Sequence, residues 1–145
     1  MKIAVGCDPN AEEFKQQLIP FIEKLGHEVT DFGSDDSIYA NVAIEVAENV
    51  AAKKFERGIL FCGTGIGVML AANKVKGIRC ALCTDVTMAR LTREHNDANM
   101  LSMGQRTTGI ETCKDIVHTF LNTPFSEGER HKGRIAKISA IEDAQ

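Results

Sequence analysis

Short apolar runs alternate along this chain with longer segments in which apolar residues recur every three or four positions. The short runs are typical of buried strands and predict five of them, over residues 2–6, 28–32, 57–62, 78–83 and 100–103. The longer segments have helical periodicity and predict helices over residues 12–25, 40–53, 66–73, 86–94, 110–121 and 130–144.

The connections between the predicted strands are too long for hairpins, so the strands should lie parallel in one sheet. The right-handed crossover rule then favours helices on both faces. We therefore expect an α/β fold, a three-layer α/β/α, Rossmann-like domain around a five-stranded parallel sheet. Ligands of such domains bind beyond the carboxyl ends of the strands. Polar or thiol side chains follow four of those ends, at residues 7–8, 62–64, 83–85 and 104–106.

Composition narrows the class of protein. The 145 residues suit one domain with a real hydrophobic core. The net charge of −3, with 20 acidic and 17 basic residues interspersed, argues against a nucleic-acid binder. No apolar run approaches the roughly 20 residues that span a bilayer, and residues 1–5 lead straight into a strand pattern without signal-peptide architecture. Five cysteines, an odd number, indicate free thiols in a reducing, cytoplasmic compartment.

The most informative segment is Ile59-Leu60-Phe61-Cys62-Gly63-Thr64-Gly65-Ile66-Gly67. It reads as a buried strand that ends in a thiol and passes through a glycine turn into a helix. Glycines allow a ligand to approach the backbone, and a helix start offers unpaired N–H groups to a negative charge. Two other interpretations of this segment are a purely structural turn and a dinucleotide-binding site. The G-x-G-x-G spacing after the third strand does not match the dinucleotide fingerprint.

Cys62 has two interpretations. A free cysteine is most often a small buried hydrophobe. A thiol at a strand end that faces a helix start is, however, readily ionised. A thiolate beside a hydroxyl and backbone N–H groups can abstract a proton next to a carbonyl, and Thr64 and the turn amides would hold the resulting enediolate.

Three further clusters carry polar chemistry. Cys80 and Cys83 form a C-x-x-C, but a zinc ribbon needs a second pair, and on a strand the two side chains should point to opposite faces. His95 ends a predicted helix, either as a cation that the helix dipole favours or as an acid/base group. Arg130 and Arg134 share one helical face and could either clamp a phosphate or simply form a solvated basic turn.

Taken in order, these motifs resemble ribose-5-phosphate isomerase B and the wider family that includes the galactose-6-phosphate isomerase subunits. The resemblance spans essentially the whole chain, as one sugar-phosphate isomerase domain over residues 1–145. It rests on segments 62–67, 71–79, 94–99, 104–106 and 130–134. It implies interconversion of a phosphorylated aldose and ketose through an enediol(ate), with no metal, nucleotide or other cofactor.

The resemblance also assigns roles. Cys62 matches the base, Thr64 and the amides of Gly63, Gly65 and Gly67 match the oxyanion hole, and His95 matches the group that assists ring opening. Contacts to the substrate are implied for Asp8, Tyr39, Asn96, Arg106, Arg130 and Arg134, the three arginines in the phosphate-binding region. Sites of this family form between two subunits, so the resemblance implies a homodimer or a dimer of dimers.

Two departures bear on the substrate. Where ribose-5-phosphate isomerases of this type usually have Asp-His-x-Gly, this chain has Asp8-Pro9-Asn10-Ala11, so the histidine that helps to hold the substrate is replaced by Pro9. Tyr39-Ala40-Asn41 is reminiscent of relatives that act on tetrulose phosphates, whereas His95 suggests a sugar whose ring must be opened. Ribose 5-phosphate is the leading substrate. Another tetrose, pentose or hexose phosphate, or a catalytically degenerate partner subunit that binds a sugar phosphate, is the alternative, and a redox protein a distant third.

Overall fold

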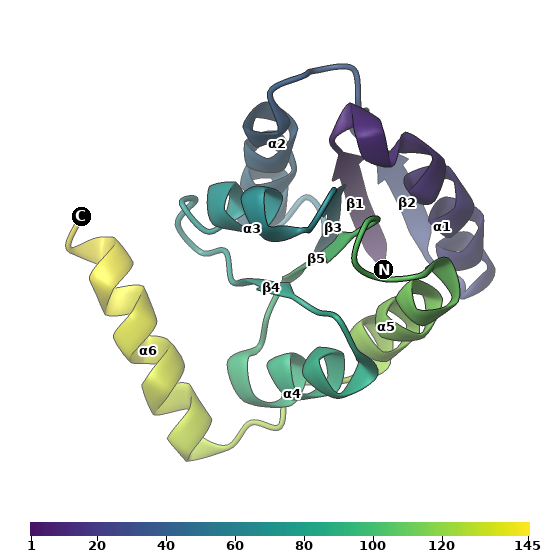
Figure 1. Ribbon diagram of the computed structural model, residues 1–145. Coiled ribbons are helices and arrows are strands. Elements are labelled where there is room, and N and C mark those ends of the chain that lie inside the picture. Colours follow the sequence, from purple (N-terminus) through teal and green to yellow (C-terminus); the bar gives the residue numbers. More distant parts are fainter.

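The computed structural model describes residues 1–145 and has five strands and six α-helices in alternation (Figure 1). The strands are β1 (Lys2–Cys7), β2 (Glu28–Asp31), β3 (Arg57–Cys62), β4 (Cys80–Leu82) and β5 (Met100–Gly104). The helices are α1 (Glu12–Lys24), α2 (Tyr39–Ala51), α3 (Ile66–Ala72), α4 (Val86–Asn96), α5 (Ile110–Asn122) and α6 (Glu129–Asp143), with a short 3-10 turn, η1 (Pro9–Ala11), before α1.

The sheet is entirely parallel, in the order β2-β1-β3-β5-β4. The registers Cys7↔Phe61 and Cys62↔Gly104 bring the carboxyl ends of the three central strands together. The predicted parallel α/β sheet is therefore confirmed. All six predicted helices are present with boundaries within two residues, while η1 was not predicted.

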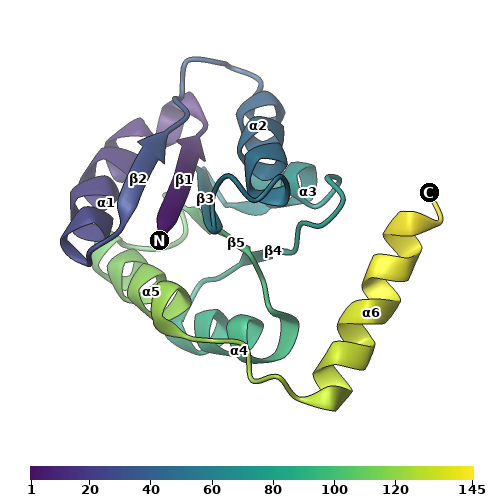
Figure 2. The ribbon, with the colours of Figure 1, turned by 180° about the vertical axis from the view of Figure 1, so that it is seen from behind.

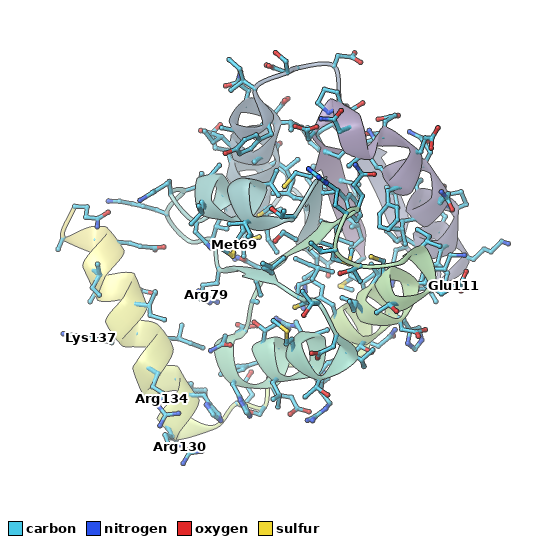
Figure 3. The ribbon with its side chains drawn as sticks, in the orientation of Figure 1. Met69, Arg79, Glu111, Arg130, Arg134 and Lys137 are labelled. Atoms are coloured by element: carbon cyan, nitrogen blue, oxygen red, sulfur yellow. The ribbon has the colours of Figure 1, made fainter.

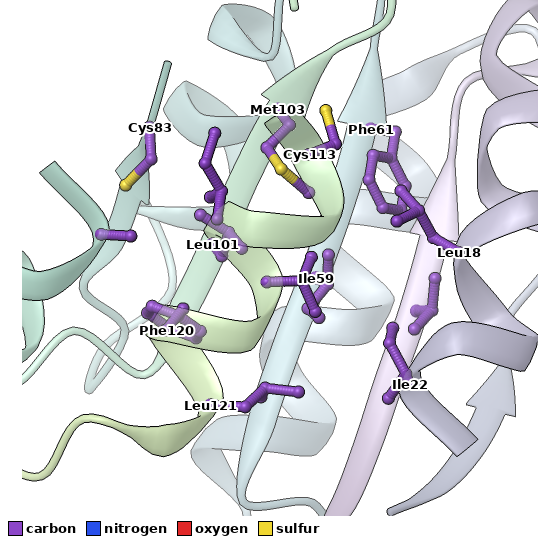
Figure 4. Close-up of a cluster of buried hydrophobic side chains, with 14 of the residues drawn as sticks. Leu18, Ile22, Ile59, Phe61, Cys83, Leu101, Met103, Cys113, Phe120 and Leu121 are labelled. Atoms are coloured by element: carbon purple, nitrogen blue, oxygen red, sulfur yellow. The ribbon is translucent and has the colours of Figure 1, made fainter. Parts of the chain in front are cut away.

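Side chains that alternate along the central strands supply two cores. Ile59 and Phe61 face one cluster, which α1, α4 and α5 cover, whereas Leu60 and Cys62 face a second cluster against α2 and α3. Figure 4 shows the first cluster, with Ile59 and Leu101 of the sheet packed near Phe120 and Leu121 of α5. Burial on both faces explains why the strand sequences read as continuous apolar runs rather than as alternating ones.

Strand β4 is shorter than the predicted 78–83 because side chains replace backbone partners at its start. The N–H of Arg79 donates to Oδ1 of Asn99 at 2.9 Å. On the outer side, the N–H of Cys80 donates to Oδ1 of Asn73 at 2.7 Å, and Nδ2 of Asn73 donates to the carbonyl of Cys80 at 3.0 Å.

Helix α6 lies apart from both cores. None of its residues is buried, and Figures 1 and 2 both show it projecting from the α4 end of the molecule and running past the body. A cavity of about 680 Å³ lies between α6 and the body, lined among others by Arg79, Asn96, Ile138 and Ile141. No helix in the structure combines the length and apolar character that a membrane span requires.

Candidate active site

The turn after β3 is built around the sulfur of Cys62. This side chain is 7% exposed, and its Sγ accepts the backbone N–H of Gly65 at 3.1 Å. An N–H aimed at sulfur stabilises negative charge there. The other four cysteines are free and buried, and burial raises the pKa of each to about 12. Only Cys62 stands at the carboxyl end of β3 with a turn amide directed at its sulfur.

Gly65 shapes this turn. Its φ of 79° is left-handed, a conformation that side chains other than glycine rarely adopt. A Cβ at this position would also lie 2.7 Å from Cδ1 of Leu82 and 2.8 Å from the carbonyl carbon of Met103. Two independent constraints therefore require glycine here, which supports a turn with a defined shape.

The end of β5 packs under the same turn. The carbonyls of Cys62 and Gly63 accept the N–H groups of Gln105 and Arg106 at 3.0 and 2.9 Å. A Cβ on Gly104 would lie 2.4 Å from the carbonyl carbon of Thr64, so the backbone of Thr64 rests directly on this glycine. These contacts leave the side chains of Thr64 and Arg106 exposed at the rim.

Thr64 itself organises the start of α3. Its Oγ1 accepts the N–H of Ile66 at 3.2 Å, while the residue remains exposed. The hydroxyl thus lies at the helix start, beside the turn whose other amide faces the sulfur of Cys62.

Two further predicted residues come to this edge. Tyr39 begins α2, and its ring lies so close to Gly67 that a Cβ there would be 2.6 Å from Cε1 of the tyrosine. Asp8 follows β1, where its N–H donates to the carbonyl of Phe61 at 3.0 Å. Its Oδ1 accepts the N–H of Asn10 at 2.8 Å and so caps η1.

We call these residues the Cys62 cluster: Asp8, Tyr39, Cys62, Gly63, Thr64, Gly65, Gly67 and Arg106. The structure brings all of them to the carboxyl edge of the sheet, where the strand pattern had predicted residues 7–8, 62–64 and 104–106.

His95 and Asn96 lie elsewhere. Helix α4 begins after the carboxyl end of β4 and ends just before the start of β5, so it runs back across the sheet. Eleven helical residues span about 16 Å, which places His95 near the amino edge. Within one chain, His95 cannot reach the sulfur of Cys62.

Arg130 and Arg134 lie with His95 rather than with Cys62. They belong to the first half of α6, which starts beside the last turn of α4 (Figure 3). The rings of His95 and His131 stack there, with centroids 4.3 Å apart. We call this second set the His95 cluster: His95, Asn96, Arg130, His131 and Arg134.

His131, Arg79 and Arg93 stand in or beside the motif segments of the sequence, but no role was predicted for any of them. Arg79 donates to the carbonyls of Asn96 and Asp97 at 2.8 and 3.0 Å, so it supports the end of α4. The available signal was their position, since Arg79 ends the motif segment 71–79 and Arg93 precedes the segment 94–99.

The two cysteines of the C-x-x-C point to opposite faces of the sheet, as the strand geometry predicted. Cys80 belongs to the core on the α2/α3 face and Cys83 to the core on the other face, and both are free thiols. No three His, Cys, Asp or Glu side chains converge in a way that could hold a metal ion.

Comparison with known proteins finds relatives that match almost the whole chain. The ribose-5-phosphate isomerase B of Escherichia coli is 42% identical over 97% of this chain and 96% of that protein. The D-erythrulose-4-phosphate isomerase of Pectobacterium atrosepticum is 37% identical over 98% and 95%. The solved structure of ribose-5-phosphate isomerase B from Clostridium thermocellum superposes with a TM-score of 0.94 at 44% identity, over 99% of both chains.

The fold, the thiol-bearing turn and these relatives define a sugar-phosphate isomerase. A family model described as Ribose/Galactose Isomerase matches residues 3–138. The chain belongs to this family.

Proposed function

We propose that this single domain, residues 1–145, interconverts a phosphorylated aldose and ketose, with ribose 5-phosphate and ribulose 5-phosphate as the leading pair. The observation that supports this most directly is the turn amide of Gly65 on the sulfur of Cys62, at the edge that carries Thr64 and Tyr39. A thiolate held this way is a suitable base for a carbon acid.

The proposed reaction is a proton transfer between neighbouring carbons. The Cys62 thiolate takes the proton from C2 of the open-chain aldose, and the electron pair of the broken C–H bond moves through a C1–C2 double bond to the aldehyde oxygen. Thr64 and the turn amides stabilise the enediolate. The proton of the C2 hydroxyl is passed to O1, and the Cys62 thiol returns its proton to C1, which leaves the ketose and the original thiolate.

We further propose that the site is completed by a second copy of the chain. The Cys62 and His95 clusters occupy opposite edges of the sheet, although a ring-opening group and a phosphate clamp must act on the same substrate as the base. In a two-fold dimer, each Cys62 cluster can meet the His95 cluster of the partner, which yields two complete sites. His95 then assists ring opening, and Arg130 and Arg134 bind the phosphate together with Arg106.

Exposed apolar side chains support such an assembly. Ile138 and Ile141 of α6 are 46% and 54% exposed, and Ile66 and Leu70 of α3 are 46% and 56% exposed. A helix with no buried residue and an apolar face lacks a partner within its own chain. A homodimer, or a dimer of dimers, would cover these surfaces. Free, buried thiols further support a reducing, cytoplasmic setting.

The choice of sugar rests on the loop after β1. Pro9 occupies the first position of η1 and has no N–H to donate, and Asp8 uses one carboxylate oxygen to cap the turn. Because this loop departs from the pattern of ribose-5-phosphate isomerases, a tetrose, another pentose or a hexose phosphate is the alternative. A degenerate subunit that only binds sugar phosphate is a weaker alternative, since pure binding requires no thiol base.

The decisive experiment is isomerisation of four- to six-carbon aldose and ketose phosphates, followed by NMR in deuterated water. Turnover of ribose 5-phosphate with deuterium at the exchanged carbon is the expected result. Turnover of a different sugar alone would retain the mechanism and assign specificity to the loop at Pro9. Absence of exchange with every sugar would favour the degenerate subunit.

A further inference from the structure

The last turn of α4 is tied to the interior by the guanidinium of Arg93, a side chain that is only 3% exposed. Its Nη1 donates to the carboxylate of Asp97 at 2.8 Å and to the carbonyl of Ala98 at 2.7 Å. Its Nε donates to the carbonyl of Thr123 at 3.0 Å. One buried cation therefore joins the end of α4 to the end of α5, where the connection to α6 begins.

That connection is bound to the same turn at a second point. The carbonyl of Glu94 accepts both the N–H and the hydroxyl of Ser126, at 3.2 and 2.7 Å. His131 then stacks on His95 at the start of α6. Away from this region, Glu142 accepts the N–H of Gly77 at 3.1 Å near the far end of α6. The direction in which α6 leaves the body is thus set mainly at the end of α4.

Neither stability nor helix capping accounts for Arg93 well. The ion pair with Asp97 is weak evidence for stability, because desolvation of the buried guanidinium offsets its attraction to a carboxylate that is 41% exposed. The end of α4 is already capped by the backbone, since the N–H of Asp97 bonds to the carbonyl of Arg93 and that of Ala98 to the carbonyl of Thr92. Of the three hydrogen bonds that the Arg93 side chain donates, those to Asp97 and Ala98 stay at the end of α4, and the one to Thr123 joins α4 to the end of α5.

We propose that Arg93 is a positioning residue, which holds His95 and the arginines of α6 in one fixed arrangement, so that the His95 cluster meets its sugar phosphate as a preformed unit. The inference rests on the proposed function, because it concerns the same site. Loss of Arg93 would let α6 turn relative to α4 and move Arg130 and Arg134 away from the phosphate.

The test compares Arg93→Met, which fills the volume without the charge, with Arg93→Lys and with Arg90→Met as a control. Arg90 lies one turn earlier on α4, is 48% exposed and pairs only with Glu94. We expect Arg93→Met to raise both the KM for ribose 5-phosphate and the dissociation constant of inorganic phosphate by about tenfold or more, with a smaller change in kcat, because misplaced binding groups cost orders of magnitude. For Arg93→Lys, both constants should lie between those of Arg93→Met and those of the wild type, and Arg90→Met should have the same constants as the wild type.

A merely structural role has a different signature. It would lower the melting temperature or the active fraction and leave KM and phosphate affinity unchanged, which overturns the inference. If Arg93→Met does not fold, Ser126→Ala decides, because this exposed residue loses only its two hydroxyl bonds, one donated to the carbonyl of Glu94 and one accepted from the N–H of Gly128. We expect a rise of about threefold in both constants for it, and unchanged constants would count against positioning.

Phosphate binding, measured by ³¹P NMR, separates this inference from the proposed function. A wild type that binds phosphate but isomerises no sugar phosphate would remove the proposed function, while the comparison with Arg93→Met still tests positioning. A wild type that binds no inorganic phosphate would overturn the role of Arg93.

Discussion

His95 and His131 stack face to face, with their ring planes 13° from parallel. Partial burial, His95 and the neighbouring Arg130 and Arg134 all lower the pKa of His131 below its ordinary value of 6.5. A lowered histidine pKa means that the folded protein binds a proton less readily than the unfolded chain does. Protonation of His131 therefore favours the unfolded chain, and this group lowers the free energy of unfolding as the pH falls below 6.5.

We expect the imidazole of His131 to titrate below pH 6.5 in an NMR titration. Arg130→Ala with Arg134→Ala should raise that midpoint toward the ordinary value, because two positive neighbours are removed. Lys137→Ala, further along α6, serves as the control. A midpoint that does not move in the double variant would show that the arginines do not act on His131.

Replacement of Cys62 by alanine should remove the base while leaving the phosphate contacts. We expect kcat to fall by about a thousandfold or more, as is usual when a catalytic acid, base or nucleophile is removed. The affinity for phosphate should be unchanged. Deuterium incorporation measures the effect. Cys113→Ala is the matched control, since Cys113 is buried in α5 and should keep normal turnover per folded molecule. Near-normal exchange by Cys62→Ala would show that another group is the base.

Gly65 and Gly26 form a natural comparison of two glycines with left-handed backbones. Nothing lies within 4 Å of a Cβ at Gly26, where φ is 96°. Gly26→Ala should therefore lower the free energy of unfolding by about 1 kcal/mol, the cost of a left-handed backbone at alanine, and leave kcat unchanged. Gly65→Ala adds a collision with the backbone of Met103 and should cost several-fold more stability and most of the activity. Urea unfolding and kcat test both, and equal losses would contradict the constraint at Gly65.

Complementation tests the shared site. Chains that carry Cys62→Ala and chains that carry His95→Ala should each be nearly inactive. After subunit exchange, half of the dimers are mixed, and each mixed dimer has one intact site out of two, so about a quarter of wild-type activity should return. Recovery near zero, with exchange verified by mass spectrometry, would mean that both residues act within one chain.

Acid sensitivity should depend on Glu12. Bonds from Ser34 and Lys15 lower the pKa of its carboxyl from 4.5 to about 2. Because the folded pKa is depressed, Glu12 contributes stability above pH 4.5 that is lost as the pH falls toward 2. Glu12→Gln should therefore destabilise the protein at pH 6 and less so at pH 3, measured by urea unfolding. A difference that is independent of pH would contradict this assignment.

The sequence predicted the fold well because each strand reads as a continuous apolar run and each helix has a clear period. Its misses have local physical causes. Arg79 bonds to the side chain of Asn99, which shortens β4, and the capping carboxylate of Asp8 forms η1 where a loop was expected. Side-chain partners of this kind leave no periodic signal.

The candidate site was predicted in part. Asp8, Cys62 and Arg106 of the Cys62 cluster stand at strand ends or just after them, and parallel strands bring such ends together, so their proximity follows from topology. The separation of His95 from Cys62 follows equally from the course of α4. What sequence could not reveal was the stack with His131 or the contact of Arg93 with Thr123, because both depend on how α6 leaves the body.

The side chain of Asn73 has a consequence for how copies of the chain can associate. By occupying both backbone groups of Cys80 on its outer side, it blocks that border of the sheet where β4 begins. An incoming strand would find donors and acceptors already taken, so polymerisation by strand addition is discouraged there. Contact between molecules is thereby directed to helical surfaces, where side chains rather than backbone decide which partner fits.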